Sequence, residues 1–182
     1  PLVISDDFDS PKLALNWQWN HNPDNELWSL SERKGYMRLK TGKVVQTISE
    51  ARNMLSQRTE GPACRGVISL DVSNMQDGDI AGLSAYCSEP GIISVNMEGN
   101  RKYLVMTDRG EEKARPGLTA ETVFLRMDCN FETDPATFFY SPADEAWTQL
   151  GGAFRMVYNL VPFIGTRFAI HRYATHSPGA AV

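Results

Sequence analysis

The chain has 182 residues, of which 42% are hydrophobic and 10% aromatic, a composition that can bury a single large core. Its formal net charge is only −4, and its 18 Lys and Arg residues are scattered along the sequence. This excludes the basic stripe that a phosphate backbone requires, and no apolar run approaches the ~20 residues that cross a bilayer. We therefore expect one folded domain, with neither nucleic acid nor a membrane as its partner.

Short alternating segments recur about every ten residues, separated by Gly, Pro, Asn and Asp, which is typical of an all-β sandwich or barrel. In residues 35–41, for example, Met37 and Leu39 fall on one face and polar residues on the other. The strands expected from this pattern, in chain order, are 35–41, 66–72, 80–86, 92–97, 102–107, 122–128, 136–141 and 166–173.

One helix is expected, over residues 45–55, where apolar residues recur at steps of three or four. β-branched residues weaken this pattern. The other elements fit two antiparallel sheets of five to seven strands packed face to face, a jelly roll. Because no repeat, low-complexity tract or linker interrupts the sequence, residues 1–182 are expected to form one β-sandwich domain.

The three cysteines, Cys64, Cys87 and Cys129, are widely spaced and odd in number, and each falls in an apolar alternating segment. We expect buried free thiols rather than a disulfide framework. No CxxC or HxxxH spacing predicts a transition-metal site, and no cofactor is expected. Asp7 and Asp9 offer hard oxygens and are weak calcium candidates; a solvated turn is the favoured alternative.

The most unusual local composition is residues 16–23, Asn-Trp-Gln-Trp-Asn-His-Asn-Pro. Indole faces stack on sugar rings, and amide and imidazole groups hydrogen-bond hydroxyls, so Trp19, Asn20, His21 and Asn22 are candidate carbohydrate-binding residues. In the alternative interpretation the indoles belong to the core and the polar residues form turns.

A second polar group contains Asn53, Gln57 and Arg58. A strand beginning near Met54 would present Asn53 and Gln57 on one side, where they could also bind sugar. The alternative is an edge strand with solvated charges, in which Arg58 pairs with Glu60. No nucleotide-binding or acyl-transfer motif occurs, although a pair of glycosidase carboxylates cannot be excluded from the pattern alone.

These motifs follow one another in the order seen in a known protein module: Asp7-Phe8-Asp9, Trp17-Gln18-Trp19-Asn20-His21-Asn22-Pro23-Asp24, Trp28-Ser29-Leu30, Gly35-Tyr36-Met37-Arg38-Leu39-Lys40-Thr41-Gly42, Ala51-Arg52-Asn53 and Gln57-Arg58-Thr59-Glu60-Gly61-Pro62. The chain closely resembles the C-terminal concanavalin A-like β-sandwich of glycoside hydrolase family 43, the β-xylosidase and arabinofuranosidase group, which is also classed as carbohydrate-binding module family 91. The resemblance implies an accessory domain beside an upstream five-bladed β-propeller that carries the catalytic carboxylates. The chain alone is then not expected to be an enzyme.

In some enzymes that the chain resembles, a loop of the sandwich places an aromatic ring over the propeller's pocket. Phe163 is at the matching position, although Val161-Pro162 stands where the family commonly has Pro-His. The ring would exclude water from the pocket; ordinary core packing is the alternative. The family pattern also continues into a further strand beyond Val182, so we expect a piece excised from a larger hydrolase, lacking a final strand.

Three functions remain open. The leading hypothesis is a module that binds xylan or xylo-oligosaccharides, packs on the catalytic propeller and shapes its pocket. The second is a purely structural buttress without sugar binding, and the third is a lyase or glucanase of concanavalin A-like fold, whose usual Glu-x-Asp-x-x-Glu strand does not occur here. The cellular location is left open.

Overall fold

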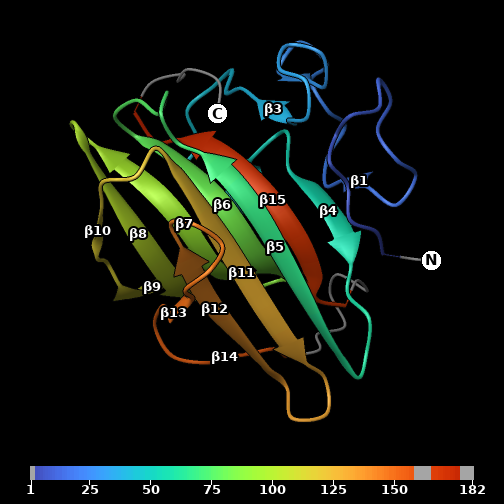
Figure 1. Cartoon of the computed structure of the whole chain (residues 1–182), viewed down its shortest axis with the longest axis vertical. Helices are drawn as coiled ribbons and strands as arrows, with labels where there is room; N and C mark the ends of the chain where they lie inside the picture. Colours follow the sequence, from blue (N-terminus) through green and yellow to red (C-terminus); the bar gives the residue numbers. More distant parts are fainter. Residues whose placement is uncertain (1–2, 158–164, 177–182) are drawn as a thin grey trace.

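The computed structural model describes residues 3–157 and 165–176, which form two antiparallel sheets packed face to face (Figure 1). The large sheet contains, in spatial order, β1 (Gln18–Trp19), β4 (Leu55–Arg58), β15 (Arg167–Ala174), β6 (Asp79–Tyr86), β7 (Gly91–Glu98), β8 (Arg101–Asp108) and β10 (Gly117–Leu118), with β9 (Glu111–Ala114) also paired to β8. The small sheet contains β13 (Thr148–Gln149), β12 (Pro135–Ser141), β11 (Thr122–Asn130) and β5 (Ala63–Asp71), with β14 (Phe154–Arg155) also paired to β12. The predicted all-β sandwich is confirmed.

The interior between the sheets is built by strict alternation along β11. Val123, Leu125 and Met127 are completely buried, and the residues between them point to the other side of the small sheet. Phe138 and Phe154, from β12 and β14, complete this layer and are also fully buried. Each such side chain contributes about 1.5–3 kcal/mol through removal from water, so this core accounts for the pairing of the two sheets.

A smaller core covers the opposite face of the large sheet. Val45, Ile48 and Met54 pack there against Ala169 and Tyr173 of β15. The helix predicted over 45–55 is wrong, because only the short 3₁₀ helix η1 (Ile48–Glu50) forms and the backbone is already extended at its C-cap. The apolar residues whose spacing predicted a helix instead lie on an irregular segment and pack against the large sheet.

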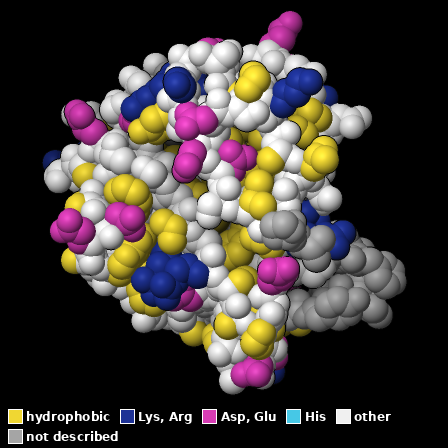
Figure 2. Space-filling view, turned by 45° about the vertical axis from the view of Figure 1, so that its right-hand side comes forward, with side chains coloured by type: hydrophobic (Ala, Val, Ile, Leu, Met, Phe, Trp, Pro, Cys, Tyr) yellow, Lys and Arg dark blue, Asp and Glu magenta, His cyan; other side chains and the backbone are white. Residues whose placement is uncertain are grey.

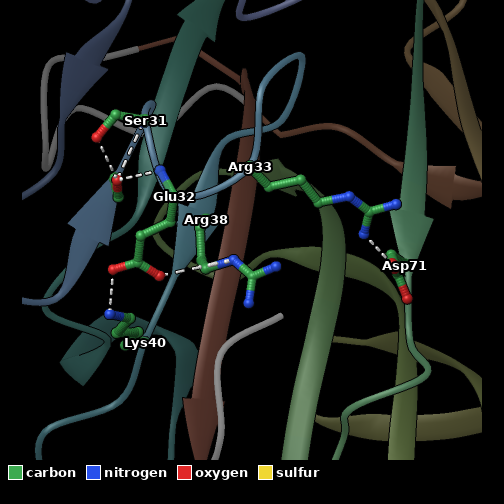
Figure 3. A network of polar contacts seen from close by, with 7 residues as sticks. Ser31, Glu32, Arg33, Arg38, Lys40 and Asp71 are labelled. Atoms are coloured by element: carbon green, nitrogen blue, oxygen red, sulfur yellow. Dashed lines mark hydrogen bonds and ion pairs between the residues drawn. The ribbon is translucent and has the colours of Figure 1, made fainter.

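The N-terminal part of the chain is held by a ribbon of β2 (Trp28–Ser29) and β3 (Arg38–Leu39) and by charges. The strand predicted over 35–41 shortens to β3 because Gly35, at φ +75°, makes a turn. Figure 3 shows Glu32 between Lys40 and Arg38, and the Arg38 Nε atom lies 3.8 Å from Glu32 Oε2. The same view shows Arg33 reaching Asp71 at the end of β5, an ion pair that ties this region to the small sheet.

Candidate functional site

Trp19 and Trp28 form an aromatic pair at the edge of the large sheet, with ring centroids 5.1 Å apart and a tilt of 53°. Trp19 lies on β1, opposite Leu55 of β4, and both indoles are half-buried. Trp17 is fixed separately, because it stacks on Phe8 and its Nε1 donates to Asp6 at 2.8 Å. The two indoles of residues 16–23 therefore pack in two different aromatic pairs.

Asn20, His21 and Asn22 follow Trp19 on the surface. Asn20 Nδ2 donates to the Tyr86 hydroxyl at 3.2 Å, which places this amide beside β6. His21 Nε2 lies 2.8 Å from the Ser49 carbonyl oxygen, and His21 and Asn22 are exposed. These polar groups are thus accessible at one edge of the large sheet, as sugar binding would require.

Asn53 and Gln57 are buried, and their amides hold the N-terminal segment in place. Asn53 accepts from the Asp24 amide and donates to the Asp24 carbonyl, each at 3.0 Å. Gln57 does the same with Ile4, at 3.0 and 3.1 Å. The oxygen and the nitrogen of each side-chain amide both form hydrogen bonds with the backbone. These two candidates therefore anchor the N-terminal segment and are not accessible to solvent.

Arg58 occupies a different position, at the exposed end of β4 directly opposite Arg167 of β15. Arg167 is in turn opposite Tyr86 of β6, and its Nη2 donates to Gln18 Oε1 at 2.6 Å. Side chains alternate along a strand and Phe168 points into the core, so these residues project from the outer face of the large sheet. We call Gln18, Arg58, Arg167 and Tyr86 the arginine row.

The arginine row carries two positive charges that no carboxylate neutralises within residues 3–157 and 165–176; the Arg58–Glu60 pair considered above does not form. Arg167 Nε is buried without a hydrogen-bond partner in the same residues. Burial, and then repulsion from Arg58, lower the pKa of the Arg167 guanidinium. Planar guanidinium donors in such a place suit carboxylates or vicinal hydroxyls.

A cavity of about 660 Å³ lies between β5 and the N-terminal segment. Its lining combines apolar residues that pack in or against the core, such as Ile68, Leu83 and Phe168, with charged residues such as Arg33 and Asp71. Figure 2, which brings this side of the molecule forward, shows hydrophobic side chains bordered by charged ones. Of the predicted sugar-binding residues only Gln57 lines this cavity, and its amide is occupied by Ile4.

No group of three or more His, Cys, Asp or Glu side chains in the described chain could hold a metal ion. Asp7 and Asp9 therefore have no third protein ligand of these types there, and calcium binding stays a prediction. Within the same residues no helix is long and apolar enough to cross a membrane. Phe163 lies outside the described residues, four positions before Arg167 in the chain.

Arg167 was not predicted from the sequence as a site residue. It comes next to Arg58 only through pairing of β4 with β15, and no local motif indicates that register. The alternation of the segment 166–173 could have shown which residues share a face with Arg167, but not which strand lies beside it.

Comparison with known proteins gives the domain its family. Residues 5–181 match the family described as the beta-xylosidase C-terminal concanavalin A-like domain, GH43_C2. The chain belongs to this family. Its members occur within larger proteins, and both the predicted family and the predicted concanavalin A-like fold are confirmed.

The GH43_C2 domain is similar to parts of several longer enzymes. A Formosa agariphila β-xylosidase is 31% identical over 176 residues, covering 84% of this chain and 29% of that protein. A solved bifunctional GH43-CE protein of Bacteroides eggerthii superposes with a TM-score of 0.93 at 41% identity, covering 97% of this chain and 24% of that one. A GH43 enzyme engineered to show endo-xylanase and exo-arabinofuranosidase activity gives 0.88 at 30% identity, with 97% and 38% covered. The chain thus spans well under half the length of these relatives and corresponds to their C-terminal module.

Proposed function

We propose that this GH43_C2 domain is a non-catalytic accessory module that binds xylan or xylo-oligosaccharides and packs beside the catalytic domain of the same polypeptide. The observation that carries the proposal is the arginine row, with two guanidinium groups lacking a carboxylate partner among the described residues. Guanidinium and amide groups hydrogen-bond sugar hydroxyls, and the Tyr86 ring supplies an apolar face for a pyranose. Asn20, bonded to Tyr86, adds a further polar group.

The position of the arginine row also supports a role beside a catalytic domain. Arg167 begins β15, and Phe163 precedes it by four positions in the chain. An aromatic ring at this point of the sequence would close a pocket of the catalytic domain by excluding water rather than by transferring protons. The relatives are longer glycoside hydrolases, which supports a catalytic domain on the same polypeptide.

A purely structural buttress is the second candidate function. It is favoured by the way in which Asn53 and Gln57 use both ends of their amides on Asp24 and Ile4. In this case the polar residues predicted to bind sugar would serve only to fix the N-terminal segment, and the arginine row would face carboxylates of the catalytic domain. The two functions differ in whether the separate chain binds sugar.

Isothermal titration of the chain with xylohexaose tests the proposal. We expect saturable binding in the micromolar to millimolar range, weakened about tenfold by Arg58→Ala, because one charge-assisted hydrogen bond is lost. Arg101→Ala, an exposed arginine on β8 of the same sheet, is the matched control and should bind as the parent does. Absence of heat at millimolar sugar would overturn sugar binding and favour the buttress. Assays on xylan and β-glucan should show no hydrolysis by this chain.

A further inference from the structure

Two of the three cysteines meet across neighbouring strands of the small sheet. Cys64 of β5 is the direct partner of Cys129 of β11. Both side chains point toward the interior: Cys129 is 3% exposed within the core, and Cys64 is half-buried and packs against the same core. Each thiol also shifts the pKa of the other, as expected for neighbouring groups. Residues far apart in sequence thus form an adjacent dithiol.

The strand register sets the spacing of this pair. The Phe131 amide donates to the Pro62 carbonyl at 2.8 Å, two residues farther along the same ladder. Because pair types alternate in an antiparallel ladder, Cys64 and Cys129 also occupy a hydrogen-bonded pair, with Cα atoms about 5.5 Å apart. Disulfides span Cα separations of about 4.4–6.8 Å, so this pair meets the Cα criterion. Opposing Cβ atoms of a hydrogen-bonded pair lie about 5.5 Å apart, more than the ~3.5–4.5 Å of a disulfide, so closing the bond draws β5 and β11 together locally.

The two thiols differ in reactivity. Cys129 and, to a lesser extent, the Glu60 backbone amide together lower the pKa of the Cys64 thiol to about 7 against the opposing effect of burial. The neighbouring Cys64 and deeper burial raise the pKa of Cys129. Cys64 is therefore the nucleophile, since the thiolate is the reactive species and Cys64 is the more exposed of the two.

We propose that Cys64 and Cys129 form a reversible intramolecular disulfide when the domain meets a small-molecule disulfide such as oxidised glutathione. The Cys64 thiolate attacks one sulfur of the small disulfide and expels the other as a thiolate. Cys129 then gives its proton to that thiolate, and its sulfur attacks Cys64 and displaces the second small thiolate, which takes a proton from water. Two protein thiols are oxidised, and one small disulfide is reduced to two thiols.

Oxidation would bond β5 to its only partner strand in the described small sheet. β5 also borders the 660 Å³ cavity, where Arg65, Gly66 and Ile68 contribute to the lining. A Cβ at Gly66 would lie 2.6 Å from the Phe168 ring, so β5 and β15 already pack closely next to this pair. The disulfide would fix the cavity wall on the side of β5.

Cys87 is the natural control. It is buried, its Sγ donates to the Glu89 carbonyl at 3.2 Å, and burial raises its pKa. Cys87 lies just past the end of β6 in the large sheet, and its pKa is influenced by Glu89 and Arg109 but by neither of the other cysteines. It should stay reduced under conditions that oxidise the Cys64–Cys129 pair.

Incubation of the full chain with oxidised glutathione, followed by thiol titration in denaturant and peptide mapping, tests the proposal. We expect the titratable thiols to fall from three to one, with a Cys64–Cys129 linkage that dithiothreitol reverses. Cys87→Ser should lose both remaining thiols, whereas Cys129→Ala should stop at a glutathione adduct on Cys64. Three thiols persisting in the parent chain, or a linkage through Cys87, would overturn the proposal. Peptide mapping of the parent chain tests for the Cys64–Cys129 linkage even if Cys129→Ala fails to fold.

Discussion

Arg58 and Arg167 lie directly opposite each other on β4 and β15, and neither pairs with a carboxylate in the described part of the chain. Like charges in opposing positions of a sheet destabilise the pair. Under the function proposed above, a sugar or a neighbouring domain would supply hydroxyl or anionic groups to this pair and offset that cost.

Arg58→Glu should raise the stability of the domain while it weakens sugar binding. The new carboxylate would face Arg167 and turn a repulsive pair into an attractive one, worth about 0.5 kcal/mol for such an exposed position. Urea unfolding measures this gain, and Arg58→Gln, which removes the repulsion without adding an attraction, should show a smaller gain. A loss of stability in both Arg58→Glu and Arg58→Gln would contradict the repulsive pair.

Asp79→Asn should be among the most destabilising single substitutions. Asp79 is fully buried and accepts from Arg172 Nη2 at 2.9 Å, and Arg172 Nη1 donates to Thr41 at 2.7 Å. Removing the carboxylate charge leaves a buried guanidinium without its counter-ion, at a cost of about 3–5 kcal/mol in the free energy of unfolding. The double variant Asp79→Asn/Arg172→Met should recover much of the loss; equal instability of the single and double variants would argue against this pairing.

Acid should destabilise the domain through His171. This side chain is completely buried, its ring nitrogens have no hydrogen-bond partner in the described residues, and burial lowers its pKa from 6.5 to about 3. Because the unfolded chain binds the proton first as the pH falls, stability is unaffected above about pH 6.5 and declines between pH 6.5 and 3, by up to about 1.4 kcal/mol per unit.

His171→Leu should flatten that decline, as measured by urea unfolding across this pH range. The exposed His21 provides the control, since His21→Gln should keep the slope of the parent chain. Parallel slopes for the parent and His171→Leu would show that other groups govern the acid response.

Gln57→Leu should release the N-terminal segment rather than unfold the sandwich. The substitution removes both hydrogen bonds to Ile4 in a region that contributes to the cavity wall. Two lost side-chain to backbone bonds cost about 1–3 kcal/mol, concentrated in residues 3–8. Hydrogen exchange should therefore speed up at the Ile4 amide, while Gln76→Ala, at an exposed position, leaves it protected. Unchanged exchange at Ile4 would refute the anchoring role.

The sandwich could be predicted because its strands alternate clearly. In β11 the period-two pattern of Val123, Leu125 and Met127 reports burial directly, and the family motifs supplied the fold name. The helix prediction for residues 45–55 was wrong because a helix and an irregular segment packed on the sheet can both bury apolar residues at Ile48 and Ala51. Local spacing cannot separate the two when tertiary packing decides.

The candidate site was predicted less well, for a physical reason. Arg58 was selected from its local motif, but its neighbours Arg167 and Tyr86 depend on the pairing of strands that are distant in sequence. The same applies to Cys64 and Cys129, which were predicted as separate buried thiols and prove to be direct cross-strand partners. Residue types are visible in a sequence, whereas register between distant strands is fixed only by the folded sheet.

The central claim, that the arginine row binds xylo-oligosaccharide, is tested most directly by a two-dimensional NMR titration of the chain with xylohexaose. The account predicts saturable shifts of the Arg167 Nε–H, the Gln18 side-chain amide and the backbone amides around Arg58 and Tyr86, while the cavity-lining residues of β5, such as Ile68, stay unmoved. Shifts confined to the cavity, or none at millimolar sugar, would contradict it.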